Sequence, residues 1–316
     1  MTAMDEPSGS VFRDEAESKS QASLPPKARP KAKHRRRRRW PGPKGALFAT
    51  LKYGSLLLVC LVIILPITGT LMTAFKTHKE YFDSNPMDPP ANWLNFDNFF
   101  TAWNSGNMFS GFVNTAIILV ISLVGTIIIG TMAAYAIDRF SFRGKRFVVF
   151  LFLLAAIVPS VTQNVATFQV VHFLGIYNTR LSAIALYIGT DIIAIYIFVQ
   201  FMRTIPVSLD EVALLDGASH WWIYRHIAFP LMKPAIVTVL IIKGVAIYNE
   251  FYIPFLYMPN PDLNVVSTSL FSFNGYFGAR WEVIAAGVII TMIPTLILFL
   301  GLQRYIYSGL TRGTTR

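Results

Sequence analysis

Six long apolar segments constrain the fold of this 316-residue chain more than any other feature. Hydrophobic residues make up 53% of the chain and charged residues only 14%, against roughly 25% charged residues in a soluble domain. A helix needs roughly 20 apolar residues to cross a bilayer, and backbone groups there must pair within the protein. The sequence therefore predicts an all-α integral membrane protein with six transmembrane helices. The predicted spans are 53–75, 111–137, 147–171, 181–202, 234–257 and 281–302.

The distribution of Lys and Arg predicts which connections are cytoplasmic, because cytoplasmic connections carry the excess of these residues. Residues 1–52 hold 13 of the 28, residues 138–146 hold four, and residues 203–233 and 303–316 hold three each. The opposite connections together hold four, and Lys243 falls inside a span. We therefore expect a multi-pass protein of the cell membrane whose two termini and 203–233 segment are cytoplasmic.

The first 46 residues are predicted to form a disordered, basic cytoplasmic tail, and residues 47–316 a single transmembrane domain. The tail is rich in Ser, Pro, Lys and Arg and poor in apolar residues, a composition that cannot bury a core. The run Arg35 to Arg39 could bind nucleic acid. A basic segment just before a span more often contacts anionic lipid and fixes topology. We therefore expect contact with the lipid bilayer and no nucleic-acid partner.

The polar segment 203–233, between the fourth and fifth spans, is predicted to form two short helices on the membrane surface. In the first helix, Ser208 and Glu211 have the spacing of a capping box. Gly217 can take the left-handed conformation that ends a helix.

The second short helix is expected to begin at Ser219 and to end at Ile227, before Phe229 and Pro230. By pattern alone the two helices are compatible with an ordinary interfacial segment or with a surface offered to a partner. The composition of the segment does not decide between these alternatives.

The spacing within 203–233 resembles the cytoplasmic loop shared by permease subunits of bacterial ABC importers. That consensus is Glu-Ala-Ala, three residues, Gly, nine residues, Ile, one residue, Leu-Pro; Val212 and Phe229 depart from it, and both are apolar. In that family the loop forms the coupling helix that seats in a groove of the ATPase subunit. The resemblance implies ATPase-coupling roles for Glu211, Val212, Ala213, Asp216, Gly217, Ile227 and Pro230.

Motifs outside this loop are similar to those of the carbohydrate branch of the family. They are Ala133-Ala-Tyr-Ala before a basic turn, Leu174-Gly-Ile-Tyr-Asn-Thr, Tyr248-Asn-Glu-Phe and a C-terminal tail that begins at Gln303. The tail resembles that of the shorter maltose-type permease subunit, and the resemblance covers roughly 50–316. It implies the type I ABC importer permease fold and half of the translocation pathway of an ATP-driven importer of a disaccharide or oligosaccharide.

The same resemblance implies the partners: a second homologous permease subunit, two ABC ATPase subunits and an extracellular solute-binding protein. The sequence contains no Gly-x-x-x-x-Gly-Lys-Ser/Thr phosphate loop and no Cys/His cluster suited to a metal. We therefore expect a non-catalytic subunit without cofactor or metal, with ATP and Mg²⁺ on the partner ATPase. The alternatives are a related permease for another solute, such as glycerol phosphate or an osmolyte, and a non-transport membrane scaffold or sensor.

Four polar residues in the spans are candidates for the translocation pathway: Asn249, Glu250, Asp191 and Lys243. Ionisable residues inside spans are rare and usually paired or functional. At 1.5 Å per residue, Asp191 and Lys243 both lie roughly 13–15 Å from the cytoplasmic face. They could form an ion pair between consecutive antiparallel helices. Alternatively, each could face the aqueous pathway separately, with Glu250 two turns beyond Lys243.

Overall fold

The computed structural model describes residues 43–157, 160–189, 192–275 and 278–312. Contacts divide the chain into two units, Met1–Val59 and Cys60–Arg316, and helix α2 continues from the first into the second. The described helices are α2 (Pro43–Phe75), α3 (His78–Asp83), α4 (Asp97–Ser105), α5 (Met108–Arg139), α6 (Lys145–Ile157), α7 (Ser160–Phe173), α8 (Arg180–Gly189), α9 (Ile192–Met202), α10 (Ser208–Leu215), α11 (His220–Ile223), α12 (Phe229–Leu231), α13 (Lys233–Asn249), α14 (Tyr252–Tyr257), α15 (Val266–Ser269) and α16 (Trp281–Arg312).

The remaining described elements are short. A π-helix, η1 (Tyr224–Ala228), and two 3₁₀ helices, η2 (Pro261–Leu263) and η3 (Leu270–Phe273), lie between the α-helices. The described strands β1 (Asn274–Gly275) and β2 (Gly278–Ala279) pair antiparallel, with Asn274 opposite Ala279.

Three described helices are long and apolar enough to cross a membrane: Leu47–Phe75, Met108–Arg139 and Trp281–Gly301. Two bent helix pairs, α8 with α9 and the 220–231 helix with α13, would bring the number to five. The first described helix, α2, begins at Pro43, inside the predicted tail, because a proline is tolerated in the first turn of a helix. The rest of that predicted tail, residues 1–42, lies outside the described residues.

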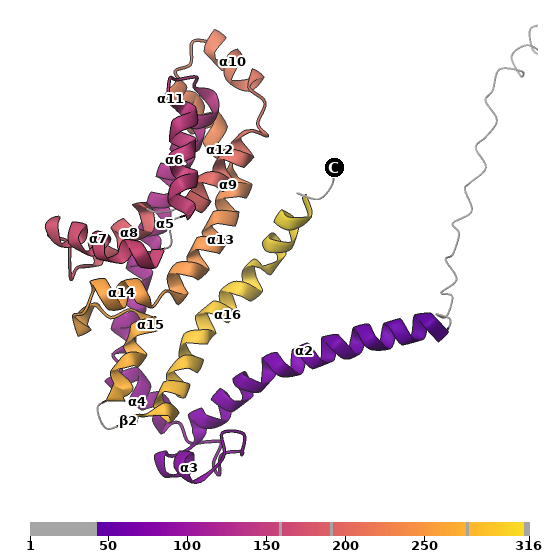
Figure 1. Cartoon of the computed structure of the whole chain (residues 1–316), viewed down its shortest axis with the longest axis vertical. Coiled ribbons are helices and arrows are strands. Elements are labelled where there is room, and N and C mark those ends of the chain that lie inside the picture. The colour runs from indigo at the N-terminus through magenta and orange to yellow at the C-terminus, as the bar shows by residue number, and fades with distance from the viewer. Residues whose placement is uncertain (1–42, 158–159, 190–191, 276–277, 313–316) are drawn as a thin grey trace, which may run out of the picture. The chain divides into compact units, whose positions relative to one another are not determined.

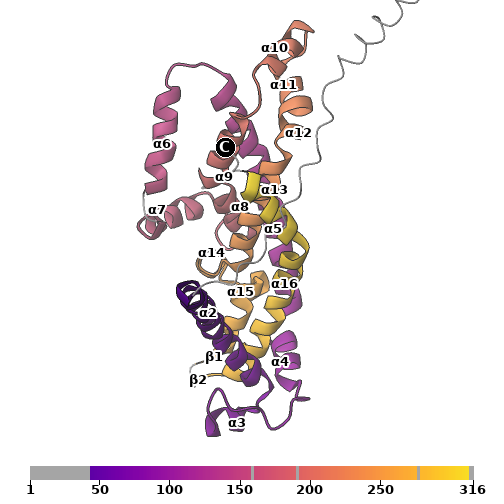
Figure 2. The same ribbon diagram turned by 90° about the vertical axis from the view of Figure 1, so that its right-hand side faces the viewer.

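Helix α5 is the central element of the second unit (Figures 1 and 2). It contacts α8, α9, α13 and α15 along its length. Two buried apolar clusters flank it, one around Ala134 and Phe198 and the other around Ile118 and Tyr187. Several of the elements that follow α5 in the sequence therefore pack against a single 32-residue helix.

Two of the predicted spans are divided in the structure. The fourth consists of α8 and α9, whose axes differ by 41°. The third falls in α6, which ends at Ile157, and α7, which begins at Ser160. Pro159 lies at that division and outside the described residues.

The prediction of a continuous fifth span over 234–257 is wrong, because α13 ends at Asn249 and Glu250 is extended, with φ −70° and ψ 124°. The Glu250 carboxylate accepts from the backbone N–H groups of Tyr252 at 2.9 Å and Ile253 at 3.4 Å, and so begins α14. Pro254 has no N–H with which to continue the ladder to the Glu250 carbonyl. That carbonyl instead accepts from the Ser267 hydroxyl at 2.6 Å.

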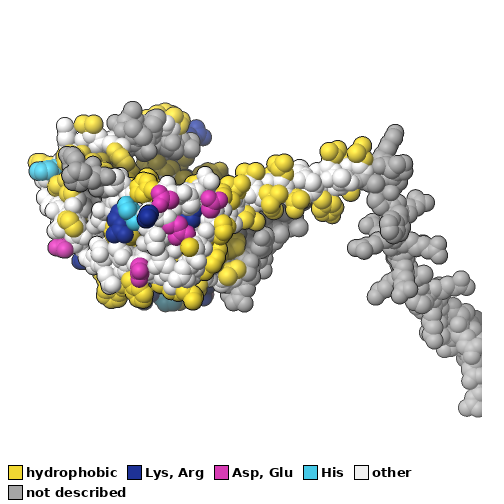
Figure 3. All heavy atoms as spheres, turned by 90° about the horizontal axis from the view of Figure 1, so that it is seen from below, with side chains coloured by type: hydrophobic (Ala, Val, Ile, Leu, Met, Phe, Trp, Pro, Cys, Tyr) yellow, Lys and Arg dark blue, Asp and Glu magenta, His cyan; other side chains and the backbone are white. Residues whose placement is uncertain are grey.

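The connection between α2 and α5 is held by polar contacts. Lys76 is fully buried, and its ammonium donates to Ser84 Oγ at 2.8 Å and to the Asn85 carbonyl at 2.6 Å. Figure 3 shows basic, acidic and histidine side chains gathered on the end of the molecule that carries α3. The connection is therefore an ordered polar structure despite its several prolines.

Close packing of α5 against α9 depends on Gly130. A Cβ at this position would lie 2.9 Å from ring carbons of the fully buried Phe198. We expect Gly130→Ala to cost about 1–3 kcal/mol through overpacking, which outweighs the ~1 kcal/mol gain in helix propensity. Thermal unfolding of the purified protein in detergent checks this, with a lower midpoint expected. Gly301→Ala is the control, because nothing lies within 4 Å of its Cβ position; an equal loss in both variants would contradict the prediction.

Candidate functional site at the 203–233 segment

The first helix of the segment, α10, begins without the predicted capping box. Val207 holds the cap position, and no side chain caps the helix there. The N–H groups of Asp210 and Glu211 donate to the Val207 carbonyl at 2.9 and 3.1 Å, and that of Leu209 donates to the Pro206 carbonyl at 3.3 Å. The prediction for Ser208 and Glu211 is therefore wrong: the turn after Pro206 starts the helix one residue early and places Ser208 in its first turn.

The end of α10 agrees with the prediction for Gly217, which has a φ of +81°. The Ala218 N–H donates to the Ala213 carbonyl at 2.9 Å, and the Gly217 N–H donates to the Leu214 carbonyl at 3.0 Å. This pair of bonds is the Schellman motif. No atom lies within 4 Å of a Cβ at position 217, so the backbone conformation, rather than space, favours glycine.

The second helix begins where the sequence predicts, since the Ser219 side chain accepts from the Trp222 N–H. It does not end before Phe229 and Pro230, and that part of the prediction is wrong. A π-turn intervenes, in which the Phe229 N–H donates to the Tyr224 carbonyl. Because Pro230 has no N–H to place, this wider turn accommodates it. The helix continues through α12 to Leu231, and a bend of 68° then separates it from α13.

The segment exposes several large apolar side chains. Leu215 is 87% exposed. The other large apolar residues exposed in the segment are Val207, Leu209, Val212, Leu214, Trp221, Trp222 and Leu231. A large exposed apolar patch on a folded protein marks an interaction surface.

The structure places the predicted coupling residues on two sides of this segment. Those exposed to solvent are Glu211, Val212, Asp216 and Gly217, whereas Ala213 is buried and Ile227 and Pro230 are half-buried. Ala213 belongs to the apolar cluster around Phe198, and Ile227 packs against it.

Arg139, the last residue of α5, contacts this segment and was missed by the sequence analysis, which counted it only as a positive charge. Its side chain is 5% exposed. Nε donates to Asp210 Oδ2 at 2.6 Å, Nη2 donates to the Ile205 carbonyl at 2.9 Å, and Nη1 pairs with Asp138. The only signals in the sequence are an arginine ending a span and an acidic first turn in α10, which do not show that the two meet.

A second polar contact joins the segment to α5. The Tyr224 hydroxyl lies 2.9 Å from Thr131 Oγ1, in a buried position. Thr131 Oγ1 donates to the Ile127 carbonyl at 2.6 Å, so its single proton is used and the tyrosine is the donor to threonine. Hydrogen bonds from both sides of Gly217 therefore reach α5: two from the residues before it and one from Tyr224.

The pathway candidates occupy different environments. Lys243 is half-buried, on the face of α13 that carries the buried Val239 and Ile247. Glu250 starts α14, and the exposed Asn249 donates to the Val245 carbonyl at 2.9 Å. Asp191 lies outside the described residues, so its pairing with Lys243 stays a prediction.

Asn249 also lines a cavity of about 840 Å³ between α5, α13, α15 and α16. Its wall is mostly apolar, with polar groups from Tyr248, Asn249, Ser267, Thr291 and Thr295. The Tyr248 hydroxyl is used, because it donates to the Thr291 carbonyl at 2.8 Å.

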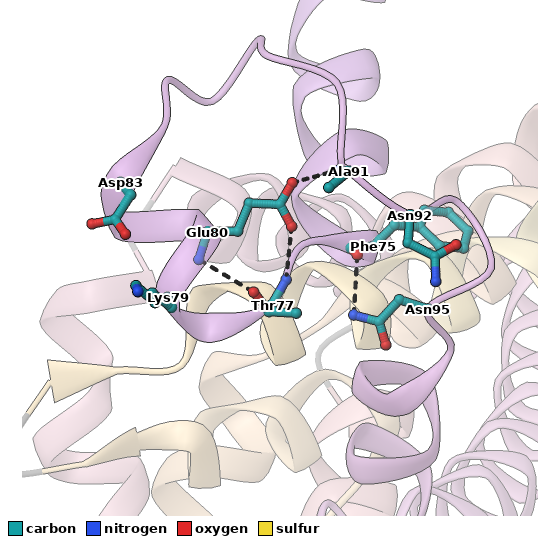
Figure 4. Close-up of a pocket in the computed structure, with 8 residues that line it drawn as sticks. All are labelled: Phe75, Thr77, Lys79, Glu80, Asp83, Ala91, Asn92 and Asn95. Carbon is teal, nitrogen blue, oxygen red and sulfur yellow. Dashed lines mark hydrogen bonds between the residues drawn. The ribbon is translucent and has the colours of Figure 1, made fainter.

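A smaller hollow of about 410 Å³ lies on the connection after α2 (Figure 4). The Glu80 carboxylate accepts from the N–H groups of Thr77 at 3.3 Å and Ala91 at 2.6 Å, and Asn95 donates to the Phe75 carbonyl at 3.2 Å. These groups serve the loop itself, so the hollow is a consequence of how the connection folds.

Several helices long and apolar enough to cross a membrane, with an exposed segment between two shorter ones, define an integral membrane protein with several spans. The chain belongs to the family of binding-protein-dependent transport system inner membrane components, whose model matches residues 126–312. This family membership and the helices together confirm a multi-pass membrane protein.

Curated relatives match nearly the whole chain. The diacetylchitobiose uptake system permease protein NgcG of Streptomyces coelicolor is 27% identical over 85% of this chain and 89% of its own length. The melibiose/raffinose/stachyose import permease protein MelC of Bacillus subtilis is 31% identical over 80% of this chain and 91% of its own length. A solved chain of a bacterial ABC transporter that imports the polysaccharide alginate has a TM-score of 0.74 at 17% identity, covering 84% of this chain and 99% of that one. This likeness confirms the predicted fold.

The two serines of the segment give a test of how its helices begin. We expect Ser219→Ala to remove a cap worth about 1 kcal/mol and to speed amide hydrogen exchange over residues 220–228 by about fivefold. Ser208→Ala removes no cap and is expected to leave exchange over α10 unchanged. Mass-spectrometric hydrogen exchange on the purified protein measures both, and the opposite ranking would show that the cap assignments are reversed.

Proposed function

We propose that this chain is a permease subunit of an ATP-driven importer of disaccharides or oligosaccharides, forming half of the translocation pathway. Family membership and relatives named as oligosaccharide permeases support this proposal. The observation that carries the mechanism is the exposed apolar surface of 207–222, shaped by the Schellman turn at Gly217. A non-transport scaffold has no comparable support.

The 203–233 segment is proposed to be the coupling element that docks on a separate ATPase. Glu211, Val212 and Asp216 are exposed and would face that partner, with the leucines and tryptophans around them. Such a surface offers exposed apolar anchors, which docking would bury, beside charged residues that would form a rim, and this is the usual anatomy of a protein interface. Movement of the ATPase would then shift the segment and the bundle between two states.

The remaining partners follow from the same proposal. They are a second homologous permease, two ABC ATPase subunits and an extracellular solute-binding protein. A related alginate transporter has been solved with a pentasaccharide-bound periplasmic protein, which supports a binding-protein partner. Lacking a phosphate loop, the chain itself would hydrolyse no ATP and need no cofactor, with ATP and Mg²⁺ on the ATPase.

In this arrangement the 203–233 segment and both termini are cytoplasmic, in agreement with the excess of Lys and Arg on that side. The basic tail would contact the lipid bilayer, and no nucleic acid is involved. Asn249, Glu250, Asp191 and Lys243 remain candidates for the pathway. The names of the relatives favour oligosaccharides over glycerol phosphate or an osmolyte as the solute.

Gly217→Pro tests the coupling role, because proline fixes φ near −65° and Gly217 has a φ of +81°. We expect the variant to insert and assemble with its partner subunits but to lose uptake by about tenfold or more. Uptake of a panel of labelled disaccharides and oligosaccharides into cells, normalised to assembled complex, measures the effect. Gly144→Pro is the control, since Gly144 also has a positive φ of +89° but lies in the turn after α5. Normal uptake by Gly217→Pro would refute the proposed coupling element.

A further inference from the structure

We infer that Arg139 is a positioning residue for energy coupling, which makes the docking helix α10 move together with α5. The inference rests on the proposed function and adds to it the contact through which the movement of α10 reaches the bundle. Arg139 makes three contacts at once, to Asp210 in α10, to the Ile205 carbonyl before α10, and to Asp138 in α5. A planar guanidinium with donors on several edges can satisfy such a set, and it stays charged at every physiological pH.

Little else in α10 holds it to the bundle. Ala213 is its one residue in the buried core cluster, and most of its other side chains are exposed. Asp210 is the exception, with a side chain 7% exposed. Its Oδ1 has no hydrogen-bond partner among the described residues, so the carboxylate is held through Oδ2 and Arg139.

The ion pair is better suited to fixing geometry than to adding stability. Removing two charges from water offsets much of their attraction, so a buried pair contributes little net free energy while strongly penalising the loss of one partner. Because Arg139 is the last residue of α5, the ion pair fixes the position of α10 both along the axis of α5 and around it. A displacement of α10 that keeps the pair intact must therefore move α5.

The bond between Tyr224 and Thr131 completes the attachment. Thr131 lies two helical turns before Arg139 on the same face of α5, and Tyr224 lies beyond Gly217 in the segment. The two halves of the segment are thus tied separately to one helix, and pivoting at Gly217 would break one of the ties. Because α5 contacts α8, α9, α13 and α15, movement transmitted to it reaches most of the second unit.

The experiment compares variants of the complete transporter, co-expressed with its partner subunits and reconstituted in lipid vesicles. The substrate is the oligosaccharide that the wild-type complex takes up best from a panel, and the readout is sugar imported per ATP hydrolysed. For Arg139→Gln we expect ATP hydrolysis to continue while this ratio falls about tenfold, a factor typical of coupling free energies between sites. Arg139→Lys should recover part of the ratio, because an ammonium restores the charge but not the three-sided contact.

Matched controls come from the same region. Arg143→Gln removes an exposed positive charge from the turn after α5 and is expected to leave the ratio unchanged. Tyr224→Phe removes only the hydroxyl that binds Thr131 and should lower the ratio. Ser122→Ala removes a buried hydroxyl of α5 that lies 17 residues before Arg139 and has no hydrogen-bond partner among the described residues, and should not.

A wild-type ratio in Arg139→Gln overturns the inference, and so does a proportional loss of uptake and hydrolysis, since that shows a purely structural role. If Arg139→Gln fails to assemble, Arg139→Lys and Tyr224→Phe decide, and wild-type ratios in both overturn it. A wild-type complex in which no sugar stimulates ATP hydrolysis defeats the proposed function, and the inference with it. That result is distinct from failure of the inference alone, in which the wild type is active and the variants remain coupled.

Discussion

Side-chain hydrogen bonds at the two ends of α5 hold the arrangement of the second unit. At one end lies Arg139 with its carboxylates. At the other, the buried Asn114 donates to the carbonyls of Asp262 and Asn264 at 3.0 and 2.9 Å and accepts from Arg180 Nε at 2.8 Å. In an apolar bundle, van der Waals packing alone specifies the helix register weakly, and directional hydrogen bonds between polar groups fix that register. The loops at both ends of the bundle therefore take their positions from one helix.

Much of this fold was predictable from the sequence, where the controlling physics is local. Apolar length predicted the helices because backbone groups in a bilayer have few other partners. Gly217 and Ser219 were predicted correctly because a left-handed turn and a side-chain cap each depend on a few neighbouring residues. The prediction for Ser208 failed at the same local level, because the turn after Pro206 competes for the same N–H groups.

The features that sequence reasoning could not supply depend on contacts distant in the chain. The end of α13 at Asn249 is fixed partly by the Ser267 hydroxyl, which donates a hydrogen bond to the Glu250 carbonyl. The hydropathy of residues 234–257 does not indicate this contact. The meeting of Arg139 with Asp210 joins residues 71 positions apart. The prediction that the second helix ends before Pro230 was wrong for another reason. A π-turn tolerates a proline at a position where the regular hydrogen bonds of an α-helix do not.

The motif that matches the permease consensus contains residues with two roles: some form the exposed surface of α10, and others attach α10 to the rest of the chain. Val212 replaces alanine at a position that is 59% exposed, so a larger side chain costs this chain no packing and changes only the surface offered to a partner. Ala213 is 8% exposed within the core cluster, where a larger residue would push α10 away from α5 and strain the Arg139 contact. Ile227 and Phe229 also pack against that cluster. The motif thus consists in part of residues that fix α10 to its own chain. A substitution at the exposed positions would change the surface offered to the proposed ATPase partner without loosening that attachment.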